Sequence, residues 1–376
     1  MRNGMGLALA GLAALAVAMG IGRFAFTPVL PMMQQDAGLS VAAGGWLASA
    51  NYVGYLAGAL WAGAMRVNAA SAIRSGLAVI GFATLAMALD AGFAAWALLR
   101  FIAGVASAWV LIQTSAFVLE RLAPLGRPIL AGVLFAGVGA GVTVAGILCV
   151  LLMALDAGSP TAWLVLGIAS LAITVSLWSS FDFPVKEKTA PGVAQRWSWE
   201  QARLVLAYGA YGFGYIIPAT FLPVMAREVV SDPAVFGWAW PVYGAAAVLS
   251  TLGVALHSGH YSNRAAWIGS HLVMALGVAA PVYWPGVGGI VLAALCVGGT
   301  FVVITMVGLQ DARTVAGAGA PRLMAAMTAA FAFGQIVGPL SVSFLISAGG
   351  TISTALLAAC AVLVAGALLL VTSSRY

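Results

Sequence analysis

Two arginines stand inside stretches of sequence that are otherwise apolar. Arg23 lies in GIGRFAFTPVLP, residues 20–31, and Arg100 lies in LLRFIAGVASA, residues 98–108. A charge held at the centre of a bilayer is costly, so each guanidinium must face a cavity, a partner or an interface. The planar fork of arginine suits a carboxylate or a phosphate. We therefore predict that Arg23 binds an anionic or strongly hydrogen-bonding part of a substrate.

The alternative for Arg23 is a structural role. Pro28 and Pro31 remove backbone donors from the same stretch, so nearby carbonyl groups are freed and can accept hydrogen bonds from a guanidinium. Asn51 is a second candidate partner for such a structural arginine.

Other polar and aromatic residues recur at helical spacing and extend the predicted substrate site. Asn51 and Tyr55 are four residues apart and share a helix face, as do Tyr211 and Tyr215. Gln335 supplies an amide from the C-terminal part of the chain. We predict that these residues bind substrate together with the first arginine; for the tyrosines, aromatic packing between helices is the alternative.

A second group of charged residues is predicted to act in gating or coupling: Arg100, Glu120, Arg121, Asp311 and Arg313. The last four form two neighbouring acid–base pairs at helix ends, as expected of salt bridges at an inner gate. Arg100 lies near the outer end of its helix, so its guanidinium can reach the outer surface of the membrane by snorkelling. His271 is a candidate proton carrier.

Composition places these residues in a membrane. The chain has 376 residues, of which 63% are hydrophobic and 7% charged, and its mean hydropathy is +1.06. A soluble domain has about a quarter charged residues. The formal charge of +6 is scattered along the chain, so nucleic-acid binding is not expected. No metal, cofactor or enzyme activity is predicted, because no nucleophile with a base and no cluster of metal ligands stands out.

A helical span needs about 20 residues, and the apolar runs predict an all-α polytopic protein with twelve transmembrane helices in two pseudo-symmetric halves. The N-terminal half covers 1–181, a cytoplasmic linker 182–203 and the C-terminal half 204–376. The expected helices are Met5–Met33, Val41–Met65, Ala72–Asp90, Ala94–Leu119, Ile129–Leu155, Thr161–Phe181, Leu204–Met225, Ala234–Leu256, Ala265–Tyr283, Gly286–Gln310, Arg322–Ser347 and Thr351–Thr372.

An internal repeat supports the two halves. Shifting the sequence by 192 residues places Gly20 on Gly212 and Pro31 on Pro223. The first helix thus has an internal counterpart, which argues against a cleaved leader. All the basic residues assigned to loops or helix ends except Arg227 fall on one side, so the positive-inside rule predicts that both termini are cytoplasmic.

This organisation resembles the major facilitator superfamily (MFS) of secondary transporters. LLRFIAGVASA resembles the arginine-bearing motif of the superfamily's fourth helix, with Arg100 in the arginine's place. This resemblance implies a gating or helix-packing role for Arg100 rather than direct contact with substrate. FAGVGAGVTVAG resembles the glycine-rich motif of the fifth helix. More narrowly, GIGRFAFTPVLPMM followed by GWLASANYVGYLAGAL is similar to the opening of the YbfB/YjiJ group of bacterial facilitators.

The resemblance implies a secondary active transporter in the bacterial inner membrane. It would move a small polar or anionic solute by alternating access, as a monomer, with the lipid bilayer as its surroundings and protons or a counter-solute as candidate coupling partners. The alternatives are an exporter of drugs or amphipathic molecules with the same fold, and a membrane sensor that does not transport.

Overall fold

The computed structural model describes residues 4–64, 68–181, 197–229 and 233–371. These residues form helices and irregular connections and contain no β-strand, which confirms the predicted helical class. The N-terminal helices are α1 (Gly4–Leu15), α2 (Phe26–Asp36), α3 (Val41–Ala64), α4 (Ala69–Ala86), α5 (Phe93–Leu122), α6 (Ile129–Ala154) and α7 (Ser159–Leu177). The C-terminal helices are α8 (Trp199–Val229), α9 (Pro233–Leu256), α10 (Asn263–Tyr283), α11 (Val287–Ala316), α12 (Ala320–Ser347) and α13 (Ile352–Val371).

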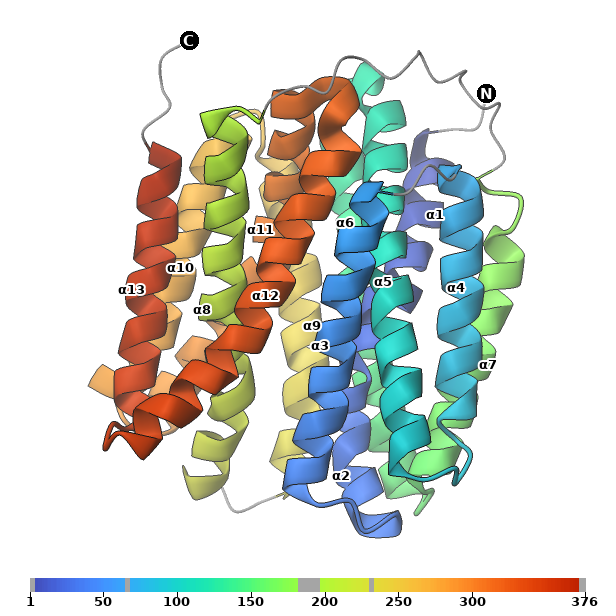
Figure 1. Ribbon diagram of the computed structural model, residues 1–376, viewed down its shortest axis with the longest axis vertical. Helices are drawn as coiled ribbons and strands as arrows, with labels where there is room; N and C mark the ends of the chain where they lie inside the picture. Colours follow the sequence, from blue (N-terminus) through green and yellow to red (C-terminus); the bar gives the residue numbers. More distant parts are fainter. Residues whose placement is uncertain (1–3, 65–67, 182–196, 230–232, 372–376) are drawn as a thin grey trace.

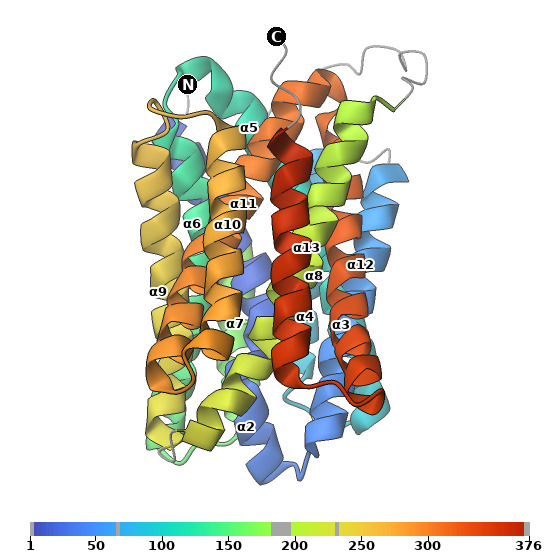
Figure 2. The same cartoon turned by 90° about the vertical axis from the view of Figure 1, so that its left-hand side faces the viewer.

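The helices form an elongated bundle. In Figure 1, α1 to α7 occupy mainly the right-hand side and α8 to α13 mainly the left, with α6, α9 and α11 in between. Helix α1 begins and α13 ends at the same end of the bundle, at the top of Figures 1 and 2, which we call the terminal end. In the described part of the chain, nine helical stretches are long and apolar enough to cross a membrane. The chain is therefore a multi-pass membrane protein.

Close contact between helices depends on glycine. The backbones of α6 and α9 approach so closely that a Cβ atom on Gly244 would lie 2.6 Å from the Thr143 nitrogen and 2.7 Å from the Gly139 oxygen. In the same way, a Cβ atom on Gly104 of α5 would collide with the carbonyl oxygen of Asn51 in α3. Small residues permit such approach between apolar helices, where packing rather than water exclusion holds the helices together.

The first span differs from the single helix expected over Met5–Met33. Between α1 and α2 the chain forms a π-helical segment, Ala16–Phe24, in which backbone bonds join residues five apart. Pro28 follows it in α2 and has no N–H, so the carbonyl of Arg23 lacks its donor five residues ahead. Apolar periodicity carries no signal for this change of bonding.

The predicted linker also differs in part. Residues 182–196 lie outside the described residues, whereas 199–203, assigned to the linker, form the first turn of α8. This turn contains the charged residues Glu200 and Arg203, and for that reason the sequence assigned it to the polar linker and not to the helix.

Candidate functional site

The π-helical segment places Arg23 about midway along the first span and directs its side chain toward α12. Arg23 is 4% exposed and Gln335 is fully buried. The Nη2 group of Arg23 donates a hydrogen bond to Oε1 of Gln335, which joins residues 312 positions apart in the chain. The Nε and Nη1 groups of Arg23 have no hydrogen-bond partner among the described residues. The guanidinium is therefore buried with most of its donor capacity unused.

Aromatic rings surround this guanidinium. Its central carbon lies 3.9 Å from the ring centroid of Tyr55, 5.2 Å from that of Phe24, 5.6 Å from that of Phe331 and 5.8 Å from that of Tyr52. The negative faces of aromatic rings attract a cation and partly offset its loss of water. None of the ion pairs formed by the described residues includes Arg23, so these rings and one amide oxygen are its main stabilising contacts.

A small cavity of about 20 Å³ lies beside Arg23. Its wall is shared between N-terminal and C-terminal helices and consists of Met19, Arg23, Phe24, Tyr55, Leu111, Val138, Tyr208, Tyr211, Phe301, Val302, Thr305 and Phe331. A water molecule needs at least about 10–15 Å³ of such space. The cavity therefore has room for about one water molecule and is too small for a larger solute.

The predicted tyrosines take different positions around this cavity. Tyr211 lines it, and its hydroxyl donates to the Phe301 carbonyl oxygen at 2.8 Å. Tyr215 is not in the cavity wall; its ring stacks on Phe301, with centroids 5.6 Å apart. Both rings thus pack against other aromatic rings, which was the alternative for the tyrosines, and Tyr211 in addition lines the cavity.

Arg100 and Asn51 donate hydrogen bonds to backbone carbonyl groups and do not line the cavity beside Arg23. Arg100 donates from Nη1 to the Gly22 oxygen at 3.1 Å and from Nη2 to the Arg23 oxygen at 3.0 Å. The Nδ2 group of Asn51 lies 3.3 Å from the Gly22 oxygen and 2.9 Å from the Arg100 oxygen. Ser107 adds a bond of 2.7 Å to the Ala18 oxygen. These side chains donate to carbonyl groups of the π-helical segment, among them that of Arg23, which Pro28 leaves without a donor five residues ahead.

The structural role considered for Arg23 is thus taken by Arg100. The sequence indicated that carbonyl groups near the prolines can accept hydrogen bonds from a guanidinium; Arg100 makes such bonds, in keeping with the helix-packing role considered for it. Sequence reasoning missed Tyr52, Ser107 and Thr305. Tyr52 adjoins Asn51, yet helical geometry alone points it to another face, and isolated serine or threonine residues in apolar helices carry little signal.

A family model described as an uncharacterised MFS-type transporter, YbfB, matches residues 15–371. The chain belongs to this family. A comparison with curated proteins finds no match. The match spans every residue of the Arg23 site, so the site is part of the MFS-type body of the chain.

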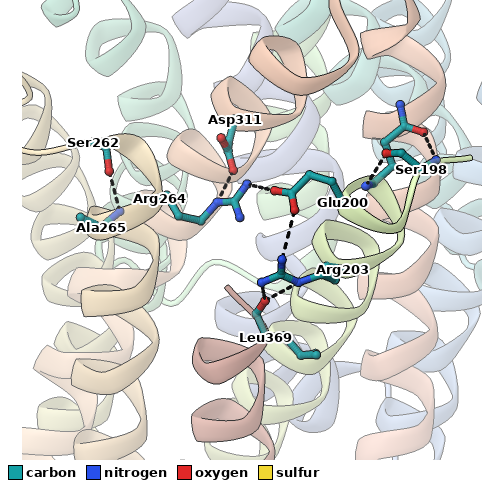
Figure 3. Close-up of polar contacts among 9 residues, drawn as sticks. Ser198, Glu200, Arg203, Ser262, Arg264, Ala265, Asp311 and Leu369 are labelled. Carbon is teal, nitrogen blue, oxygen red and sulfur yellow. Dashed lines mark hydrogen bonds and ion pairs between the residues drawn. The ribbon is translucent and has the colours of Figure 1, made fainter. Parts of the chain in front are cut away.

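A network of charged side chains joins helices of the MFS-type bundle at its terminal end (Figure 3). The Arg264 side chain of α10 bonds Asp311 of α11 at 2.7 Å and Glu200 of α8 at 2.6 Å. Arg203 bonds Glu200 at 3.2 Å, and its Nε donates to the Leu369 oxygen of α13 at 2.8 Å. The network therefore ties four C-terminal helices to one another.

The other predicted gating residues lie apart from this network. Arg313 lines a cavity of about 400 Å³ at the terminal end, between the connection that joins α5 to α6 and the ends of α10 and α11. Glu120 is exposed. Arg121 lies 3.5 Å from the Phe117 ring centroid and donates to the Phe117 oxygen at 3.1 Å. Asp311 pairs with Arg264, a residue that sequence neighbourhood did not suggest as its partner.

Proposed function

We propose that this MFS-type chain is a secondary transporter whose buried Arg23 binds a small anionic solute. One observation carries the proposal: Arg23 is buried at the contact between N-terminal and C-terminal helices, with two donor groups unpartnered among the described residues. An unpaired charge at the centre of a bilayer costs on the order of 3 kcal/mol on insertion scales. An anion would neutralise that charge and use the free donors.

N-terminal and C-terminal helices both contribute to the cavity wall, so a relative movement of these helices would open the cavity to a solute. In the proposed mechanism, residues 1–181 and 204–376 form two six-helix halves that rock about Arg23 and expose it to each side of the membrane in turn. The proposed setting is the bacterial inner membrane, with twelve spans and both termini cytoplasmic. The cavity at the terminal end would then face the cytoplasm.

The proposed transport does not require coupling to protons through a carboxylate near the centre of the membrane. The described carboxylates that have resolved side chains lie in loops or near helix ends: Asp36, Asp90, Glu120, Asp156, Glu200 and Asp311. We propose uniport or exchange of one anion for another. Uptake into proteoliposomes with and without an imposed pH gradient tests this point, and a transport rate that follows the gradient at constant membrane potential would contradict it.

The binding role is tested by thermal-shift screening of purified protein against a panel of small anions, followed by transport of each hit. Arg23→Ala should abolish binding and transport, and Arg23→Lys should retain at most part, because an ammonium lacks the planar fork. Arg322→Ala is the matched control, since Arg322 is exposed at the start of α12. Undiminished binding and transport by folded Arg23→Ala would sink the proposal.

A further inference from the structure

The side-chain amide of Gln335 uses only its oxygen in hydrogen bonding. Its Oε1 accepts from Arg23, whereas its Nε2 has no partner among the described residues although the side chain is fully buried. Reversing the amide would turn N–H groups toward N–H groups, so the oxygen must face the guanidinium. A buried donor left without an acceptor costs about 1–3 kcal/mol. The contact therefore leaves donors without a partner among the described residues on both side chains: Nε2 of Gln335, and Nε and Nη1 of Arg23.

The geometry of the guanidinium shows what would fit better. Nε–H and one Nη2–H point in the same direction and form a two-pronged fork for the two oxygens of a carboxylate. Gln335 contacts Nη2, and Nε has no partner among the described residues. A single amide oxygen thus takes one prong of a site built for two oxygens.

We infer that Gln335 is an internal stand-in for the carboxylate of the solute, holding Arg23 in the empty protein and giving way when the solute binds. This inference rests on the proposed function of Arg23. Displacement would also break a hydrogen bond between α12 and the first span, so binding and separation of these helices would occur together. Removing such a stand-in should raise the affinity for the solute, whereas removing a residue that only contacts the bound solute should lower it.

The surroundings narrow the class of solute. The rings of Tyr55, Phe24 and Phe331 face the guanidinium, and Tyr208 and Tyr211 line the adjoining cavity. Such walls suit an apolar or planar body. A single cation suits a single negative charge. The geometry therefore points to a small organic monocarboxylate, and a planar aromatic acid fits these walls well.

The test measures binding of benzoate to the purified full-length chain in nanodiscs by calorimetry, with benzamide as the uncharged probe of the same shape. Gln335→Ala should bind benzoate about 3- to 10-fold more tightly than wild type, because no internal hydrogen bond has to be broken. Gln335→Glu should lose benzoate binding, because its carboxylate fills the fork permanently. Benzamide should bind none of these proteins measurably.

Gln113→Ala is the matched control. Gln113 lies two residues beyond Leu111 of the cavity wall and so on another face of α5, and its replacement should leave affinity unchanged. Weaker benzoate binding by folded Gln335→Ala, or wild-type affinity in Gln335→Glu, would overturn the stand-in role. Absence of saturable benzoate binding to both wild type and Gln335→Ala would overturn the assignment of a monocarboxylate. Benzoate binding that survives Arg23→Ala would instead refute the proposed function itself.

Discussion

Arg100 donates a hydrogen bond of 3.0 Å to the backbone oxygen of Arg23, so one intramembrane arginine holds the main chain of the other. The two arginine side chains therefore have different roles. Arg100 supports the π-helical segment, and Arg23 is left free to face the contact between N-terminal and C-terminal helices.

Arg100→Lys should lower stability although it preserves the charge. A lysine ammonium lacks the fixed fork with which Arg100 serves the Gly22 and Arg23 oxygens at once. Losing one such charged bond costs about 1.5–3 kcal/mol. Thermal unfolding in detergent should show a lower Tm than wild type, while Arg322→Lys at the exposed start of α12 leaves the Tm unchanged. Equal Tm values for both variants would contradict the supporting role of Arg100.

Asn51→Asp should destabilise the protein more than the same change at Asn68. Asn51 acts as a donor to two carbonyl oxygens, and an aspartate carboxylate cannot donate. Asn68 acts as an acceptor, from the Ala70 nitrogen at 2.9 Å, and an aspartate can accept that bond. We expect a loss of about 1–3 kcal/mol per missing donor bond at Asn51. Unfolding of the two variants in parallel gives the comparison, and similar stability would show that donation by Asn51 is unimportant.

Gly244→Ala should impair folding and transport, whereas Gly253→Ala should not. Both residues lie in α9, but a Cβ atom on Gly244 would meet the backbone of α6 within 2.7 Å and one on Gly253 meets nothing within 4 Å. Overpacking of this kind costs about 1–3 kcal/mol. The measurements are Tm and transport rate. A wild-type rate and Tm in Gly244→Ala would mean that α6 and α9 need not approach so closely.

Arg264→Gln should weaken the terminal-end network by leaving Asp311 and Glu200 without this cation. The Arg264 side chain is 17% exposed and that of Glu200 is 29% exposed, so screening by water limits the loss to about 1 kcal/mol. A double-mutant cycle with Glu200→Gln should give a coupling energy that falls as salt is added. Arg313→Gln, which lies outside this network, is the control. Additive effects of the two network changes would show that the pair contributes no interaction energy.

The sequence predicted the helical class and the positions of the helices well, because continuous apolar runs leave little choice of structure in a membrane. Ile129–Leu155 was expected as a helix, and α6 covers Ile129–Ala154. The division into two halves and the membrane orientation stay predictions. The sequence carried no sign of the π-helical segment, because a change of backbone register needs no change in hydrophobicity.

For the candidate site, residue type was the useful signal. Arg23 was singled out because a buried charge is costly, Tyr55 because it shares a helix face with Asn51, and Gln335 because its amide can form a hydrogen bond; the structure places Arg23, Tyr55 and Gln335 together. Their role in binding stays a prediction. The bond between Arg264 and Asp311 was not foreseen, because it joins residues 47 positions apart and depends on how α10 and α11 meet.

The π-helical segment also determines how the first span responds to a change in length. Each π-type bond encloses one residue more than an α-type bond, so deleting a single residue between Ala16 and Phe24 can be absorbed by a return to α-helical bonding. With α-type bonds the Arg23 carbonyl would have its donor four residues ahead, at Thr27, in place of Pro28, and would no longer need Arg100, whereas the Phe24 carbonyl would face Pro28, which has no N–H. A deletion here would therefore exchange one set of polar partners for another, an effect that no single substitution in the span reproduces.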